Sequence, residues 1–162
     1  MTQEIPTTRA FTITRAFTAR PDSLYRVYAE PALKRRWLYG TEGTVVLSYE
    51  PDFRPGGVER AHFHFGGGMI HTEQRFEELI PDRLIRLRRV MWIEGALKLI
   101  SDRCLRITPI TGGAEADYTA EVQMFDPADT LQRNRDTVAW YLVRLNGIAT
   151  ELERGDAAAL SG

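Results

Sequence analysis

Residues 115–154, EADYTAEVQMFDPADTLQRNRDTVAWYLVRLNGIATELER, decide the fold, because a strand pattern changes into a helix pattern within one continuous stretch. Over residues 115–124 apolar and polar side chains alternate, so one face of this strand is dry and the other is wet. From Leu131 to Leu152 apolar residues recur at helical spacing and form a stripe. The stretch therefore predicts a sheet with one apolar face and a long helix that covers it.

The helix is expected to begin just after Asp126, whose carboxylate suits an N-cap, with Pro127 at the first helical position. Gly155 is expected to end it, because glycine is common just past a last helical turn. The sequences at the two ends, residues 1–9 and residues 155–162, are expected to be flexible.

The residues before this stretch predict the other elements in chain order. Residues 11–17 alternate like a strand, and residues 21–40 form two short helices separated by Pro31. Residues 43–109 contain β-branched and aromatic runs separated by turn sequences, which is typical of antiparallel strands. We expect an α+β fold, in which a curved antiparallel sheet of about seven strands wraps around the long C-terminal helix. A concave apolar space between sheet and helix is the usual place for a small ligand.

Composition indicates one domain, over residues 10–154, and excludes several functional classes. With 21 basic and 22 acidic residues the formal net charge is −1, so no overall field attracts nucleic acid or an anionic membrane. No apolar run approaches the roughly 20 residues that a membrane-spanning helix needs, and no signal-peptide pattern opens the chain. Cys104 is the single cysteine, which excludes an internal disulfide. We expect a cytoplasmic protein that neither binds nucleic acid nor inserts into a membrane.

All three histidines, His62, His64 and His71, lie near Glu73 in one expected hairpin, and this raises the question of a metal site. The answer depends on the register of the two strands. If residues 67–68 form a two-residue loop, His64 opposes His71 and His62 opposes Glu73. Three imidazoles and a carboxylate would then share one face, which is a suitable ligand set for zinc.

A three-residue loop over residues 66–68 gives the other register and breaks this cluster, because His71 and Glu73 then lie on the opposite face. Residue types alone do not make a coordination geometry. We therefore expect no bound metal, with His62 and His64 on the solvent face of the sheet.

Familiar catalytic and cofactor motifs are absent from the sequence: it contains no GxGxxG, GxSxG, HExxH or phosphate-loop pattern. The glycines at 66–68 lie between two strands and not before a helix, which argues against a phosphate cradle. No cofactor is expected, and no catalytic residue is assigned.

Two arginines, Arg15 and Arg103, share the strand parity of apolar neighbours and so are expected on the core side. A buried arginine needs a partner. Each either lies near a strand end and extends its charge to water, or anchors a ligand carboxylate or phenolate inside the cavity. Arg86 and Arg88 are expected to face solvent instead.

The order of these features resembles the START-like (SRPBCC) superfamily, and within it the bacterial homologues of the heat-shock-protein ATPase activator domain. The resemblance is carried by FTITRAFTARPDSLYRVYAEPALKRRWLYG at 11–40, DFRPGGVERAHF at 52–63, RFEELIPDRLIRL at 75–87 and the terminal helix. It includes a tryptophan near residue 37 and an arginine followed by a Gly-Gly pair. Glu59 and Ala61 depart from the pattern, since many relatives carry aromatic residues at these places after the Gly-Gly pair.

This resemblance implies a helix-grip fold around an apolar cavity, and a binding function for a small hydrophobic or aromatic ligand as carrier, sensor or sequestering protein. The alternatives are an enzyme of cyclase or hydrolase type that uses polar cavity residues, and a module that docks on a chaperone. A homodimer is a further assembly that the resemblance implies. The residues expected to line the cavity are Arg15, Trp37, Glu59, Phe63, Phe76, Leu87, Arg103, Tyr118, Val138, Tyr141 and Leu142.

Overall fold

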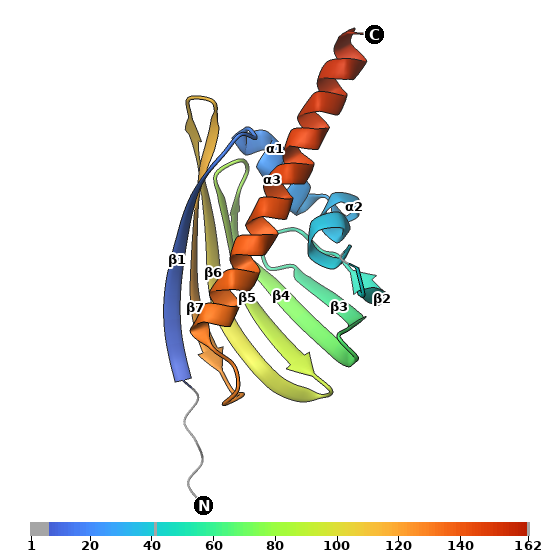
Figure 1. The fold of residues 1–162 in the computed structure, drawn as a ribbon, viewed down its shortest axis with the longest axis vertical. Helices are drawn as coiled ribbons and strands as arrows, with labels where there is room; N and C mark the ends of the chain where they lie inside the picture. Colours follow the sequence, from blue (N-terminus) through green and yellow to red (C-terminus); the bar gives the residue numbers. More distant parts are fainter. Residues whose placement is uncertain (1–6, 41, 162) are drawn as a thin grey trace, which may run out of the picture.

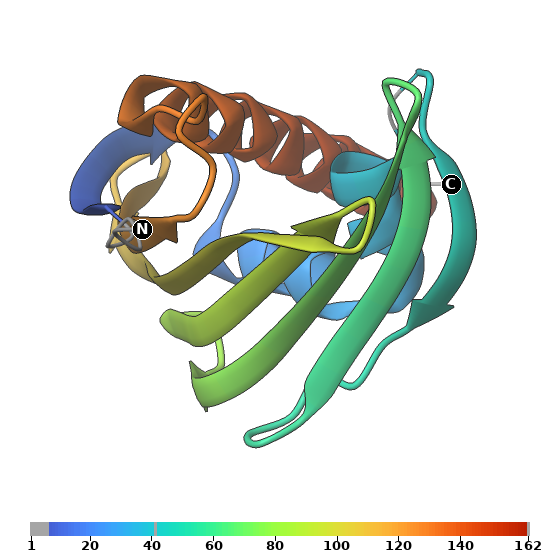
Figure 2. The ribbon, with the colours of Figure 1, turned by 90° about the horizontal axis from the view of Figure 1, so that it is seen from below.

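The computed structural model describes residues 7–40 and 42–161, and in it seven strands form one antiparallel sheet in the order β1-β7-β6-β5-β4-β3-β2. The long helix α3 crosses the concave face of this sheet, as Figures 1 and 2 show from two directions. The expected curved sheet and long C-terminal helix are therefore confirmed. The strands are β1 Thr7–Phe17, β2 Val45–Glu50, β3 Val58–Phe65, β4 Gly68–Ile80, β5 Leu84–Ile93, β6 Ala96–Ile110 and β7 Gly113–Met124.

Two short helices follow β1, as the sequence predicts, and each begins with a proline: α1 is Pro21–Ala29 and α2 is Pro31–Lys34. A π-helical turn, η1 (Arg35–Tyr39), continues from α2 and ends before Gly40. This connection carries the chain across the concave face from β1 at one edge of the sheet to β2 at the other. None of the described helices is both long enough and apolar enough to cross a membrane.

The first strand begins earlier than the sequence predicts. Residues 7–9, which were expected to be flexible, belong to β1 and pair with residues 122–124 of β7. The pairing explains the difference, because an edge strand is stabilised by its neighbour as well as by its own residues. Residues 1–6 lie outside the described part of the chain.

Helix α3 (Leu131–Ser161) begins later than expected, and Thr130 rather than Asp126 caps it. The Thr130 Oγ1 accepts the backbone N–H of Arg133 at 3.1 Å, which is the usual N-cap arrangement. Asp126 instead accepts the backbone N–H of Ala128 at 2.9 Å in the preceding turn, and its other oxygen lies 3.2 Å from the Nζ of Lys98. The carboxylate therefore stabilises the turn that leads into the helix.

The other end of α3 also differs, because Gly155 lies inside the helix and does not end it. A glycine inside a helix costs about 1 kcal/mol relative to alanine, but alanines and a leucine follow and favour the helix. Residues 155–161, expected to be a flexible tail, continue α3 beyond the edge of the sheet (Figure 1), and residue 162 lies outside the description.

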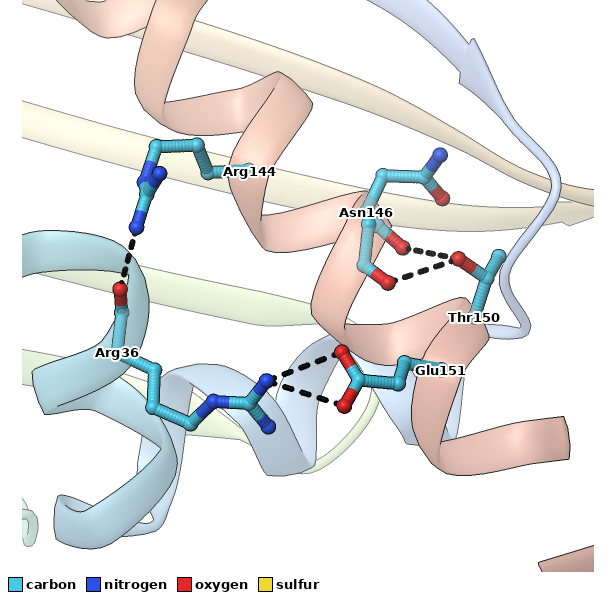
Figure 3. A network of polar contacts seen from close by, with 6 residues as sticks. Arg36, Arg144, Asn146, Thr150 and Glu151 are labelled. Carbon is cyan, nitrogen blue, oxygen red and sulfur yellow. Dashed lines mark hydrogen bonds and ion pairs between the residues drawn. The ribbon is translucent and has the colours of Figure 1, made fainter. Parts of the chain in front are cut away.

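Polar contacts fix η1 against the middle of α3 (Figure 3). The guanidinium of Arg144 on α3 donates to the backbone carbonyls of Trp37 at 3.2 Å and Arg36 at 2.6 Å. The Arg36 side chain in turn donates to both carboxylate oxygens of Glu151, at 3.1 and 3.0 Å. These bonds satisfy carbonyls that the short helix leaves free, and they hold Trp37 beneath α3.

Candidate functional site

A cavity of about 800 Å³ lies between the concave face of the sheet and the N-terminal half of α3. This volume falls within the ordinary range for small-molecule sites, about 300–1,000 Å³. Phe65 and Trp140, two of the large apolar side chains that remain exposed, stand among its lining residues and mark its opening. The space is therefore reachable from solvent and is not a sealed void.

Most of the residues that the sequence predicts for a cavity do line it, and they come from both the sheet and the helices. Leu87, from β5, and Leu142, from α3, both line the space and are almost fully buried. The predicted residues that line the cavity are Trp37, Phe63, Leu87, Arg103, Tyr118, Val138, Tyr141 and Leu142.

Arg15, Glu59 and Phe76 were also predicted to line the cavity, but they do not. Arg15 is exposed on the edge strand β1, two residues before that strand ends, so its charge reaches water. Phe76 is fully buried against Phe53, with ring centroids 4.8 Å apart. Glu59 is buried in an ion pair with Lys34. Phe76 and Glu59 thus belong to the filled half of the concave face, beneath α1 and α2.

The two halves of the concave face differ in what covers them. Beneath α1 and α2, large rings such as Tyr28 and Phe53 fill the space, with centroids 6.1 Å apart. Beneath the first turns of α3 the lining side chains include Asn134, Thr137 and Val138, which are short. Larger side chains of α3, such as Trp140 and Tyr141, also line this part, and the cavity occupies the space between the helix and the sheet.

A polar row crosses the otherwise apolar concave face. In the strand register Glu59 pairs with Gln74, Gln74 with Arg89, and Arg89 with Ser101, so these residues lie side by side on β3, β4, β5 and β6. Gln74 and Arg89 line the cavity. Neither residue was predicted from the sequence to line the cavity, although Arg89 shares the strand parity of Leu87, the same signal that predicts Arg103 on the core side.

Arg103 is held firmly in the cavity floor. Its side chain is almost fully buried, and its Nε donates to the Ser101 Oγ at 2.8 Å. Its Nη1 donates to the hydroxyl of Tyr118 at 2.9 Å. Both partners are neutral groups, so the positive charge of Arg103 is oriented by hydrogen bonds but is not balanced by them.

Lys34 and Glu59 form a buried ion pair next to the cavity, with Nζ and Oε2 3.0 Å apart. The Tyr49 hydroxyl donates to the other oxygen of Glu59 at 2.9 Å, and the rings of Tyr28 and Phe76 lie 4.5 and 4.9 Å from the Nζ. Burial lowers the pKa of Lys34, and the Glu59 carboxylate opposes this shift. Burial also raises the pKa of Tyr49, and the negative charge of the nearby Glu59 raises it further.

The histidine hairpin has a register that neither expected loop gives. Gly66 and Gly67 form the two-residue loop, with φ of 60° and 80°, as a hairpin turn with two left-handed residues requires. His62 therefore opposes His71, with ring centroids 4.1 Å apart. The His71 Nε2 lies 3.4 Å from a carboxylate oxygen of Glu73.

These histidines are on the convex face, away from the cavity, and His62 and His64 are exposed as expected. His71 packs on Trp92, with centroids 5.0 Å apart. Within the described residues no group of three or more His, Cys, Asp or Glu side chains is arranged to hold a metal ion.

Comparisons of the sequence with family models and with curated proteins give no match. Comparison of the structure does find similar folds. The Mll3558 protein from Rhizobium loti aligns with a TM-score of 0.79 at 26% identity, over 88% of this chain and 97% of its own. The fold is the helix-grip fold.

Two further structures with lower identity have the same architecture. An AHSA1-like protein from Aeromonas hydrophila aligns with a TM-score of 0.68 at 10% identity, over 90% of this chain and 94% of its own. The protein Ara h 8.0201 aligns with a TM-score of 0.63 at 11% identity, over 96% of this chain and all (100%) of its own. At these identities the similarity concerns the fold, and function has to be argued from the site.

Proposed function

We propose that this protein binds a small hydrophobic or aromatic molecule in the cavity between the sheet and α3, as a cytoplasmic carrier, sensor or sequestering protein. The cavity of about 800 Å³ is the observation on which the proposal rests. A ligand placed there would meet apolar walls from both layers, including Leu87, Leu99 and Leu142. Burial of apolar ligand surface contributes about 2.5 kcal/mol for each 100 Å² removed from water.

The helix-grip fold supports this proposal, and so does the general relationship to the START-like superfamily that the AHSA1-like and Ara h 8.0201 structures suggest. Membership in the ATPase-activator homologues is part of the proposal. A chaperone partner, a homodimer and an enzymatic activity stay predictions from the resemblance. Glu59 is not placed for catalysis on a cavity ligand, since it does not line the cavity and is engaged by Lys34 and Tyr49.

Titration with a neutral fluorescent dye, N-phenyl-1-naphthylamine, tests the proposal. Its emission rises in apolar surroundings, so we expect a saturable increase with one site per chain. Native mass spectrometry of freshly purified protein is the second measurement, and we expect a retained small molecule in part of the population. A linear, non-saturating dye signal together with a mass equal to the bare chain would reject cavity binding.

A further inference from the structure

Two arginines of the sheet line the cavity, Arg89 and Arg103, and neither forms an ion pair with a carboxylate among the described residues. Arg103 is almost fully buried and bonds to Ser101 and Tyr118, both neutral. The Nε of Arg89 is buried with no hydrogen-bond partner among the described residues. Arg103 is thus a buried cation held only by neutral partners, and Arg89 is a partly buried one whose Nε has no partner among these residues. A cation removed from water is stabilised by a negative partner, so an anion bound between the two guanidiniums would be favourable.

Glu59, the buried carboxylate among the described residues, already has partners of its own. Glu59 shares the polar row with Arg89, but its oxygens contact the Nζ of Lys34 at 3.0 Å and the hydroxyl of Tyr49 at 2.9 Å. Lys34 and Glu59 cancel each other, so the two arginines remain as the uncompensated charge on the cavity floor.

The acidic residues among the lining side chains lie at the start of α3 and in the segment before β2, at the opening of the cavity. Asp126 is paired with Lys98, with Nζ and Oδ2 3.2 Å apart. Asp129 accepts the backbone N–H of Thr130 at 2.9 Å. The remaining acids there, Glu42 and Asp136, belong to exposed residues. Two basic residues, Lys98 and Arg133, also line this end, so the acids there outnumber the bases, whereas the floor carries Arg89 and Arg103.

We propose that the ligand is an amphipathic molecule with an anionic head group, which Arg89 and Arg103 bind on the cavity floor while its apolar part contacts the walls. Gln74 lies beside Arg89 in the register, is buried, and lines the cavity, so its amide adds a neutral donor to this head-group site. This inference rests on the proposed function and names the class of ligand.

The structure leaves the required donors free. Arg103 uses Nε and Nη1 within the protein, and its Nη2 makes no hydrogen bond to a described residue. The Nε of Arg89 is buried and has no hydrogen-bond partner among these residues. Charge-assisted hydrogen bonds from guanidinium groups in a low-dielectric site are stronger than neutral ones, and a carboxylate or phosphate matches their planar geometry.

Displacement of N-phenyl-1-naphthylamine by ligands with the same ten-carbon tail tests the head-group site. The competitors are decanoate, decyl phosphate and the neutral 1-decanol. One charge-assisted hydrogen bond contributes about 1.5–3 kcal/mol, so we expect an anion to bind at least about tenfold more tightly than decanol. The stronger of the two anions identifies the head group as carboxylate or phosphate.

Arg89→Gln and Arg103→Gln should each reduce the affinity for the preferred anion about tenfold, since each removes one charged donor group. The affinity for decanol should change less than about twofold, because its apolar contacts remain. Arg88→Gln is the matched control, since Arg88 neighbours Arg89 on β5 but is exposed and lies near Asp102 on the convex face. It should leave all three affinities unchanged.

Equal binding of decanol and both anions by the unmodified protein would overturn the head-group proposal, and this comparison needs no variant to fold. Loss of anion preference in Arg88→Gln as large as in Arg89→Gln would overturn it too. Failure of the neutral dye and of all three competitors to bind would instead reject the cavity as a binding site. Circular dichroism checks the fold of each variant, and Arg89→Lys, which keeps the charge, should retain part of the preference.

Discussion

The Nζ of Lys34 and the Oε2 of Glu59 lie 3.0 Å apart, and their side chains are only 1% and 2% exposed. Lys34 belongs to α2 and Glu59 to β3, so the pair joins the helical connection to the sheet beneath it. Tyr49 adds β2 to the same group through its bond to Glu59. This group fills the part of the concave face beside the cavity.

Lys34→Met should destabilise the protein by about 3–5 kcal/mol, because it leaves the Glu59 carboxylate buried without its cation. The double variant Lys34→Met with Glu59→Leu should recover most of this loss, since no charge is then left buried. Urea unfolding of the single and double variants measures both effects. A double variant no more stable than Lys34→Met would show that the pair itself, and not the unpaired charge, stabilises the fold.

Arg86→Gln is the control for this experiment. Arg86 contacts Glu77 at 3.2 Å, but its side chain is 47% exposed. Solvent screens such a pair, and its loss should cost less than about 1 kcal/mol.

The buried tyrosines predict a loss of stability at alkaline pH. Burial raises the pKa of Tyr28 and Tyr39, and that of Tyr49 as well. A group whose pKa is raised in the folded state contributes its full stability below its unfolded pKa, about 10 for tyrosine, and loses it as the pH rises further. Unfolded chains release these protons first, so the urea midpoint should fall steadily above about pH 10.

Lys34 has the opposite effect on the pH dependence of stability, because burial lowers its pKa in the folded state. Raising the pH towards the unfolded value of about 10.4 removes the penalty of burying its charge. Ultraviolet absorbance of tyrosinate measures the ionisation of the tyrosines directly. Tyr28→Phe should reduce the loss of stability at alkaline pH. Ionisation of all six tyrosines near pH 10 without unfolding would contradict the prediction.

Filling the cavity should remove ligand binding without removing the fold. Val138 lines the cavity from α3, so the larger indole of Val138→Trp would occupy space that the ligand needs. We expect N-phenyl-1-naphthylamine affinity to fall at least about tenfold, since a lost apolar contact area of some 60 Å² already corresponds to that factor. Val143→Trp on the same helix is the control, because Val143 is 62% exposed, and it should bind the dye normally.

Gly57 in the Arg-Pro-Gly-Gly segment has a packing requirement. A Cβ on Gly57 would collide with the backbone carbonyl oxygen of Asp52, and Gly57 accepts the N–H of Phe76 at 3.0 Å. Gly57→Ala should therefore destabilise the protein by about 1–3 kcal/mol, as overpacking does. Thermal unfolding gives the comparison with Gly147→Ala in α3.

Gly147 has open space around it, so alanine there should stabilise the helix by about 0.5–1 kcal/mol. A stabilising Gly57→Ala, or a destabilising Gly147→Ala, would contradict this account of the two positions.

Much of the fold was predictable from local sequence. The alternation in β7 and the turn residues between strands are properties of neighbouring residues, and they predicted the sheet, the two short helices and the long helix. The same parity predicted Arg103 and Tyr118 on the concave face, where they line the cavity. Side-chain parity along one strand needs no knowledge of its partner.

What the sequence by itself determined is therefore the kind of each element and the direction of most side chains. Only the tertiary structure decided which residues meet: the Gly66–Gly67 loop pairs His62 with His71, and the connection through α2 brings Lys34 to Glu59. It also decided that rings fill one half of the concave face while a cavity stays open between the sheet and the N-terminal half of α3 in the other half. Register, helix placement and packing depend on residues distant in sequence, because each is set by the best fit of whole elements to one another.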